Sequence, residues 1–263
     1  MPSTSGSGMN DEWMRRARSF GQVAELYDRW RPDYPDALYA DVFEQGSGRC
    51  VLEAGAGTGR ATLALAARGA SVVAVEPDAA MAAVARRRTR GLSVEVQESS
   101  FEDCAVAAGT FDLVVAAQAW HWVDPERGAA VAARALRPGG GLCLWWNRPG
   151  ALAGQVWDAI HDAYAEHAPA LDRRAVLHQQ PEREQHFEPA PGFMPWTVRT
   201  YDWSATYDAE SYSGLVRTHS DHLQLPSRQH ERLIEAIRAA ITDTGGGRLK
   251  YLYRTVLVTA QVR

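Results

Sequence analysis

The chain has 263 residues, of which 46% are hydrophobic and 23% are charged, and its formal net charge is −4. This length and composition are typical of a folded protein with a full core, and they argue against general disorder. The slightly acidic balance argues against a nucleic-acid-binding surface, which would need a basic face, and no apolar run reaches the length of a transmembrane helix.

The N-terminal segments predict a tail followed by helices. Residues 1–11 are rich in Ser, Gly, Thr and Asn, which predicts a disordered tail. A helical pattern covers residues 12–28, and residues 29–35 contain two prolines, two aromatic residues and two arginines. Asp36 can cap a further helix over residues 37–43. The prolines also fit a simpler role, in which they end one helix and start the next while the aromatic residues pack.

A glycine-rich turn follows the first predicted strand. Residues 50–52 are an apolar run that predicts a buried strand, and residues 61–68 are strong helix formers. Between them lie Gly55, Gly57 and Gly59, which let the backbone turn sharply and approach a ligand without a Cβ atom. The following helix directs unpaired N–H groups toward the turn. This order of strand, turn and helix predicts a nucleotide-binding α/β unit.

The spacing of the turn indicates which nucleotide it binds. A dinucleotide fingerprint would need a third glycine at position 60, where the chain has Arg60. The pattern here is acid-x-G-x-G-x-G, in which Glu53 can accept hydrogen bonds from a ligand ammonium or from loop amides. The second predicted strand, residues 71–75, ends at Glu76, which is placed to hydrogen-bond both hydroxyls of a ribose.

The next elements continue an alternation of strands and helices. The pattern predicts helices over residues 79–88 and 125–136 and strands over residues 92–97, 111–116 and 142–147. The strand at 111–116 is continuously apolar, as a central parallel strand should be. After its carboxyl end, where open α/β sheets bind ligands, come Trp120, His121 and Trp122. Residues 136–140 (LRPGG) end the second helix and turn the chain into the next strand.

Together these motifs resemble the class I S-adenosylmethionine-dependent methyltransferases, in particular the small-molecule branch that includes the trans-aconitate and ubiquinone-pathway enzymes. The resemblance extends from about residue 20 to residue 147. It implies an α/β fold with a doubly wound, Rossmann-like, seven-stranded sheet, an antiparallel last strand and a helical cap. It also implies methyl transfer from S-adenosyl-L-methionine to a small-molecule acceptor, an acidic or aromatic metabolite, by in-line displacement.

The resemblance and the motifs predict the site residues. We expect the cofactor to contact Glu53, Gly55, Ala56, Gly57, Thr58, Gly59, Glu76, Pro77, Met81, Ser100, Phe101 and Gln118. We expect the lid and the substrate pocket to contain Tyr27, Arg31, Tyr34, Trp120, Trp122 and Asn147. Many family members have Asp where Ser100 stands, which implies a weaker or water-mediated adenine contact. His121 is the candidate general base, or else a positioning or structural residue beside the two tryptophans.

The resemblance also implies how the rest of the chain is organised. After the tail we expect lid helices over residues 12–45, a cofactor-binding core over 46–150, a helical cap over 151–195 and the C-terminal part of the core over 196–263. That last part would supply strands over residues 197–203 and 251–262, with helices over 210–223 and 227–242 between them.

The cysteines and histidines give no metal pattern. Cys50, Cys104 and Cys143 have neither disulfide nor zinc spacing, which predicts buried thiols in a reducing compartment, and the N-terminus lacks a signal-peptide pattern. The segment His219-Ser220-Asp221-His222 lacks a convincing ligand set, as does His161 with His167, so we expect no metal. We therefore expect a cytoplasmic protein with a small-molecule partner and no nucleic-acid or membrane partner. The sequence does not define its oligomeric state.

Three alternatives remain open from the sequence. The fold could serve as an S-adenosylmethionine-binding module that binds only or hosts non-methylating chemistry. An NAD-dependent oxidoreductase is disfavoured because Arg60 occupies the position of the third glycine. An RNA methyltransferase would need a contiguous basic groove, whereas the predicted cap is acidic and rich in histidine.

Overall fold

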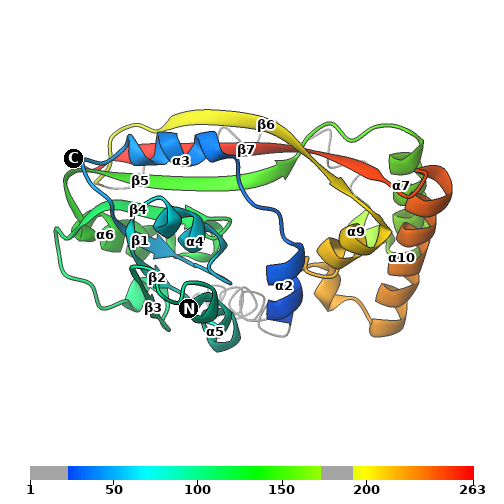
Figure 1. Ribbon diagram of the computed structural model, residues 1–263, viewed down its shortest axis with the longest axis horizontal. Coiled ribbons are helices and arrows are strands. Elements are labelled where there is room, and N and C mark those ends of the chain that lie inside the picture. The colour runs from blue at the N-terminus through cyan, green and yellow to red at the C-terminus, as the bar shows by residue number, and fades with distance from the viewer. Residues whose placement is uncertain (1–22, 173–191) are drawn as a thin grey trace, which may run out of the picture.

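A computed structural model of the chain describes residues 23–172 and 192–263 (Figure 1). The predicted tail at residues 1–11 and the first part of the predicted lid lie outside these residues, as does the cap segment 173–191.

The described chain is organised around one seven-stranded sheet. Its strands are β1 (Cys50–Ala54), β2 (Ser71–Val75), β3 (Val94–Gln97), β4 (Phe111–Ala117), β5 (Leu136–Pro149), β6 (Thr197–Tyr207) and β7 (Leu249–Gln261). They lie in the order β3-β2-β1-β4-β5-β7-β6. Strands β1 to β5 pair in parallel, and β7 is antiparallel to both β5 and β6. The predicted fold class, including the antiparallel last strand, is therefore confirmed.

Helices cover both faces of the parallel part of the sheet. Helices α3 (Asp36–Phe43) and α4 (Arg60–Ala67) pack on one face, which presents Val51 and Leu113. Helix α6 (Pro125–Ala135) packs on the opposite face, which presents Leu52 and Val114. Neighbouring residues of β1 and β4 thus enter different clusters, because successive side chains of a strand point to opposite faces. Helix α5 (Ala79–Arg88) is capped by Asp78, whose carboxylate accepts the N–H groups of residues 80 and 81.

The strands β5, β6 and β7 extend beyond the parallel sheet and carry helices at their far end (Figure 1). There α7 (Gln155–His167), α9 (Ala209–Val216) and α10 (Ser227–Ala239) form a separate hydrophobic cluster with the ends of β6 and β7. We call these three helices, with the segments that join them to one another and to the strands, the helical end. Packing therefore places α9 and α10 with α7, although the sequence grouped them with the C-terminal part of the core.

Helix α2 (Ala24–Trp30) lies between the parallel sheet and the helical end. It packs against α5 on one side and against α9 on the other. Gly214 of α9 lies directly against the Trp30 ring, and a Cβ atom there would come within 2.4 Å of the indole nitrogen. The N-terminal segment thus joins the two parts of the described structure.

Several element boundaries differ from the sequence expectation. The strands expected over residues 142–147 and 197–203 continue as β5 and β6, because antiparallel pairing with β7 runs from Gly141↔Gln261 to Pro149↔Tyr253 and from Thr197↔Thr259 to Tyr207↔Leu249. The helix expected over 210–223 ends at Val216, and a short 3₁₀ helix, His222–Gln224, follows it. No helix among residues 23–172 and 192–263 is long and apolar enough to cross a membrane.

Candidate active site

The three glycines after β1 all have positive φ angles, of 65°, 59° and 78° at Gly55, Gly57 and Gly59. At Gly55 a Cβ atom would lie 2.5 Å from the Cβ atom of Ala119, so the close approach of the loop after β4 excludes any side chain. At Gly57 a Cβ atom would meet nothing within 4 Å, because this residue borders a cavity. The turn therefore keeps one glycine for packing and leaves another open toward a ligand.

Glu76 joins the end of β2 to the glycine turn. Its Oε2 atom accepts the N–H of Gly57 at 2.8 Å, and its Oε1 atom accepts the N–H of Asp78 at 2.9 Å. Burial raises the pKa of the Glu76 carboxyl to about 7, although both of these hydrogen bonds lower it. The carboxylate oxygens retain further lone pairs, which can accept hydrogen bonds from a ligand.

Glu53 is fully buried at the end of β1. Its Oε2 atom accepts the hydroxyl of Thr62 at 2.5 Å, whereas its Oε1 atom is buried with no hydrogen-bond partner among the described residues. Burial raises the pKa of the Glu53 carboxyl to about 8, and the nearby Glu76 raises it further. An unsatisfied buried acceptor is costly unless a ligand group pairs with it.

Three neighbouring cavities meet at these residues. The first cavity, of about 110 Å³, is lined by Gly55, Gly57, Glu76, Pro77, Met81, Ser100, Phe101 and Trp122 among others. The second, of about 40 Å³, is lined by Tyr34, Glu53, Gly55, Ala56, Gly57, Thr58 and Arg60 among others. The third, of about 350 Å³, lies between the sheet and the helical end. Tyr27 and Gln118 line all three cavities.

Gln118 has a strained backbone at this meeting point. Its φ angle is 58°, which is uncommon for a residue other than glycine and is frequent at functional sites. Its N–H donates to the carbonyl of Trp145 at 2.8 Å, and its side-chain amide donates to the carbonyl of Asn147 at 3.3 Å. Both bonds fix Gln118 against β5, so its position between the cavities is determined by the sheet.

The two tryptophans of the segment after β4 have different surroundings. Trp120 packs edge-on against Phe101, with ring centroids 5.8 Å apart, and belongs to the core beneath α6. Trp122 lines the first and third cavities. Because residues 120–122 form one 3₁₀ turn, the two indole rings point in different directions, so Trp120 packs in the core while Trp122 borders the cavities.

His121 faces the third cavity, and its ring lies 4.8 Å from that of Trp122. Its Nδ1 atom accepts the indole N–H of Trp146 at 3.3 Å. Desolvation by the cavity walls, together with the cation of Arg148, lowers the pKa of His121 to about 4, although the residue as a whole is exposed to solvent. The imidazole is therefore neutral at pH 7, and because Nδ1 accepts a hydrogen bond, its proton is assigned to Nε2.

The predicted lid residues surround the junction of the cavities. The Arg31 guanidinium donates from Nε to the hydroxyl of Thr218 at 2.9 Å and from a terminal nitrogen to its carbonyl at 2.7 Å. It also lies 4.9 Å from the centroid of the Tyr27 ring. Arg31 thus holds α2 against the helical end, a role that the sequence did not suggest. Asn147 lines the second and third cavities and donates to the carbonyl of Asp33 at 3.1 Å.

The predicted residue Gly59 does not line these three cavities, and the site contains residues that the sequence analysis did not assign to it. A Cβ atom on Gly59 would lie 3.1 Å from Ala85, so this glycine lets α4 pack on α5. Arg60 lines the second cavity and donates to Asp33 at 2.6 Å. The helical end adds aromatic and polar side chains to the third cavity, namely Trp157, Tyr164, Tyr212, His219, Asp221 and His222, and strand β7 adds Tyr251 and Tyr253.

Comparison with known proteins identifies the family. A model of the methyltransferase domain matches residues 52–144, from β1 into β5. An uncharacterized methyltransferase of Mycobacterium tuberculosis is 32% identical over 251 residues, which cover 92% of this chain and 95% of that protein. The chain belongs to the S-adenosylmethionine-dependent methyltransferases. This assignment confirms the resemblance and replaces the oxidoreductase alternative.

Solved structures agree with the methyltransferase fold. A proposed type II methyltransferase from Anaeromyxobacter dehalogenans matches with a TM-score of 0.64 at 24% identity, over 89% of this chain and 97% of that one. A phosphoethanolamine N-methyltransferase from Haemonchus contortus, solved with phosphomonomethylethanolamine and S-adenosylhomocysteine, matches with a TM-score of 0.52 at 13% identity, over 95% of this chain and 59% of that one. The finer likeness to the trans-aconitate branch stays a prediction.

Proposed function

We propose that this methyltransferase binds S-adenosylmethionine across the first and second cavities and methylates a small aromatic molecule in the third. The observation that carries the proposal is the junction of the cavities at Gln118 and Tyr27, because a methyl donor must meet its acceptor at one point. The bound cofactor would supply a sulfonium methyl group, which is already a good electrophile.

The residues around the first two cavities suit the two ends of this cofactor. Glu76, with free lone pairs beside the open side of Gly57, would accept the ribose hydroxyls in the first cavity. Glu53, with its unpartnered Oε1 atom, would accept the ammonium of the amino-acid end in the second. Each acid would then pair with a donor of the matching kind, which offsets the cost of burying the carboxylates.

The third cavity supports an aromatic acceptor more than an acidic one. Its walls include the rings of Trp122, Trp157 and Tyr212, which suit a flat apolar molecule. An arginine can bind a substrate carboxylate through its planar guanidinium, but the guanidinium of Arg31 is already hydrogen-bonded to Thr218. The remaining polar groups, chiefly histidines and Asp221, would orient a hydroxyl or amine of the acceptor.

In this proposal His121 positions the acceptor and does not serve as its general base. A pKa of about 4 makes the imidazole a weak base. With Nδ1 occupied by the Trp146 indole, Nε2–H can donate a hydrogen bond to an acceptor atom. Holding the acceptor in line with the methyl group can supply a large part of the rate enhancement, about 7–11 kcal/mol in favourable cases.

Two measurements test the function. Calorimetry measures the binding of S-adenosylhomocysteine, the product form of the proposed cofactor, and of NAD. We expect the protein to bind S-adenosylhomocysteine and not NAD. Formation of S-adenosylhomocysteine is then followed with a panel of phenols, aromatic amines and small acids, with RNA as a control acceptor. Turnover with an aromatic member supports the proposal. Cofactor binding without turnover on any acceptor would instead favour the binding-only alternative.

A further inference from the structure

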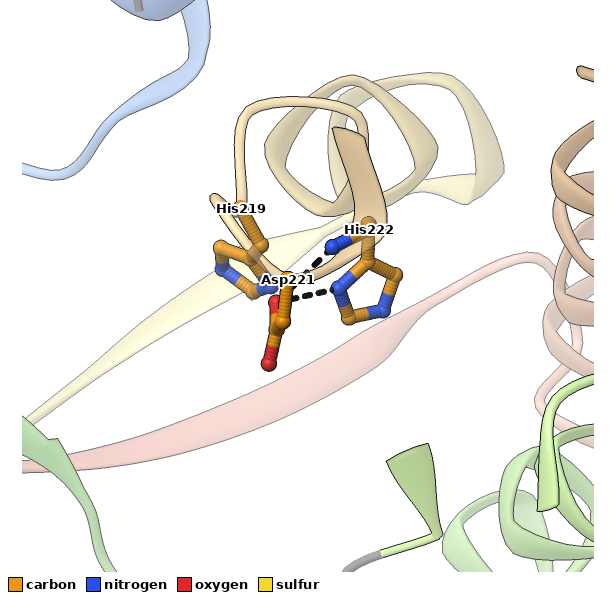
Figure 2. Close-up of side chains that lie close together, drawn as sticks. All are labelled: His219, Asp221 and His222. Atoms are coloured by element: carbon orange, nitrogen blue, oxygen red, sulfur yellow. Dashed lines mark hydrogen bonds and ion pairs between the residues drawn. The ribbon is translucent and has the colours of Figure 1, made fainter. Parts of the chain in front are cut away.

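Three side chains with metal-binding atoms lie together in the segment between α9 and α10. They are His219, Asp221 and His222, and one candidate ligand atom from each lies within 4.8 Å of the other two (Figure 2). The backbone brings them together in a tight turn, in which the N–H of His222 donates to the carbonyl of His219 at 3.1 Å. Two imidazoles and one carboxylate are a ligand set that zinc and similar dications bind.

The orientation of His222 is fixed from both sides. Its Nδ1 atom lies 2.7 Å from Oδ1 of Asp221, and its Nε2 atom lies 2.8 Å from the hydroxyl of Tyr164 on α7. The His222 residue is only 3% exposed. A histidine that ligates a metal through one ring nitrogen usually hydrogen-bonds an oxygen through the other. Tyr164 supplies that oxygen, so Nδ1 is the nitrogen directed toward the cluster.

The cluster also lines a cavity. His219, Asp221 and His222 all line the third cavity, which His121 and Trp122 line as well. The residue before the cluster, Thr218, is held by the two hydrogen bonds from Arg31. A three-ligand site beside a cavity is the arrangement of catalytic zinc sites, which keep one coordination position open for water or substrate.

We propose that His219, Asp221 and His222 bind one zinc-type dication, with an open coordination position toward the third cavity. On binding, the ion takes the place of a proton at His222 Nδ1, and the neutral ring then carries its proton on Nε2, which donates to the hydroxyl of Tyr164. From the sequence we expected no metal, because this segment lacks a convincing ligand set by itself. The ion would bind an oxygen or nitrogen of the methyl acceptor, and only this last statement rests on the proposed function.

Alternatively, the same side chains form only a hydrogen-bonded chain from Asp221 through His222 to Tyr164. In that case the protein takes up no metal, so a metal-binding measurement distinguishes the two possibilities. Full-length protein without an affinity tag is treated with a chelator, dialysed, and titrated with Zn²⁺ in a calorimeter and with Co²⁺ in a spectrophotometer. We expect one ion per chain and visible absorption from the cobalt form.

Variants locate the ion. His219→Ala and Asp221→Asn change half-buried residues, so we expect both to fold, and circular dichroism checks this. Each removes a ligand and should weaken Zn²⁺ binding at least about tenfold, as much as the loss of an outer partner does. His167→Ala is the matched control, because His167 does not line the cavity and its Nε2 atom lies 3.7 Å from Glu166. This control should bind Zn²⁺ as the wild type does.

Two results would overturn the site. One is the absence of Zn²⁺ and Co²⁺ uptake by folded wild-type protein. The other is uptake that His219→Ala and Asp221→Asn leave unchanged, which would place the ion on other histidines of the chain. Calorimetry with S-adenosylhomocysteine on the same samples separates this proposal from the proposed function. Absence of metal uptake by protein that binds S-adenosylhomocysteine would rule out the metal site alone. Metal uptake by protein that does not bind S-adenosylhomocysteine would rule out the cofactor assignment alone.

Discussion

Glu76 Oε2 accepts the backbone N–H of Gly57 at 2.8 Å, so one carboxylate joins the end of β2 to the open glycine of the turn after β1. This contact places a carboxyl group at the wall of the first cavity, beside Gly57, where a Cβ atom would meet nothing within 4 Å. The sheet order explains it, because β1 and β2 are parallel neighbours and their carboxyl ends therefore meet at one edge.

Replacement of this carboxylate should weaken cofactor binding. Glu76→Gln keeps the size of the side chain but removes its charge and one acceptor atom. Charge-assisted hydrogen bonds contribute about 1.5–3 kcal/mol, so we expect the affinity for S-adenosylhomocysteine to fall about tenfold or more. Isothermal calorimetry measures the change. Glu98→Gln is the control, since Glu98 lies on the surface beside Arg86, and equal affinity losses in the two variants would contradict the assignment.

Cofactor affinity should rise with pH. The pKa values of about 7 for Glu76 and about 8 for Glu53 mean that both carboxyls are largely protonated at pH 6. Ligand hydroxyls and an ammonium favour the ionised forms, so affinity for S-adenosylhomocysteine should increase between pH 6 and pH 8.5. Calorimetry at several pH values measures this, and Glu76→Gln should show a shallower increase. A flat profile in the wild type would contradict the role of both acids.

The stability of the ligand-free protein should decrease as pH rises, whereas cofactor affinity should increase. Both folded pKa values lie above the ordinary value of 4.5, so the unfolded state binds fewer protons than the native state above that pH. The free energy of unfolding should therefore fall as pH rises from about 4.5 to about 8. Urea unfolding across this range checks the sign. In Glu76→Gln the decrease should be smaller, and an unchanged slope would contradict the raised pKa of Glu76.

His121 should affect turnover without giving a titration near neutral pH. Its pKa of about 4 keeps the imidazole neutral throughout the range from pH 6 to pH 9. We expect His121→Ala to lower methyl transfer with near-wild-type cofactor affinity, and His121→Gln, which keeps a side-chain N–H, to retain more activity. A limb near pH 6.5 in the wild-type profile that disappears in both variants would show instead that His121 is a general base.

Alanine substitutions at Gly55 and Gly57 should have different effects on stability and cofactor binding. Gly55→Ala places a Cβ atom 2.5 Å from Ala119 at a φ of 65°, so we expect a loss of stability of about 1–3 kcal/mol from crowding in addition to backbone strain. Gly57→Ala has space but narrows the first cavity, so we expect strain alone and weaker cofactor binding. Gly109→Ala is a matched control, with a φ of 61° and nothing within 4 Å. Equal cofactor affinity in Gly57→Ala and Gly109→Ala would contradict an open glycine at the site.

Local patterns were sufficient to predict the parallel strands and the glycine turn. Strands β1, β2 and β4 are short apolar runs with buried neighbours on both faces, and their ends fix Glu53, Glu76 and Gln118 at one edge of the sheet. The glycine turn could be recognised because positive φ angles restrict the residue type at each position. These features depend on segments a few residues long.

The surroundings of the third cavity depend on distant pairings, which the sequence pattern does not encode. Strand β6 reaches Tyr207 because it pairs with β7, which follows some forty residues later in the chain. Arg31 meets Thr218 across 187 residues, so its role as a connector had no local signal. The same applies to His222, whose partner Tyr164 lies on another helix. Trp120 and Trp122 are the same residue type on either side of His121, so the sequence alone could not distinguish their environments. The 3₁₀ turn directs their side chains differently.

The central claim is that an adenosyl cofactor lies over the glycine turn with its two ends bound by Glu76 and Glu53. A crystal structure of the protein with S-adenosylhomocysteine tests it most directly. We predict the ribose hydroxyls within hydrogen-bond distance of the Glu76 carboxylate and the ligand ammonium beside Oε1 of Glu53. A ligand bound elsewhere, or one in the first cavity with neither acid in contact, would contradict the account.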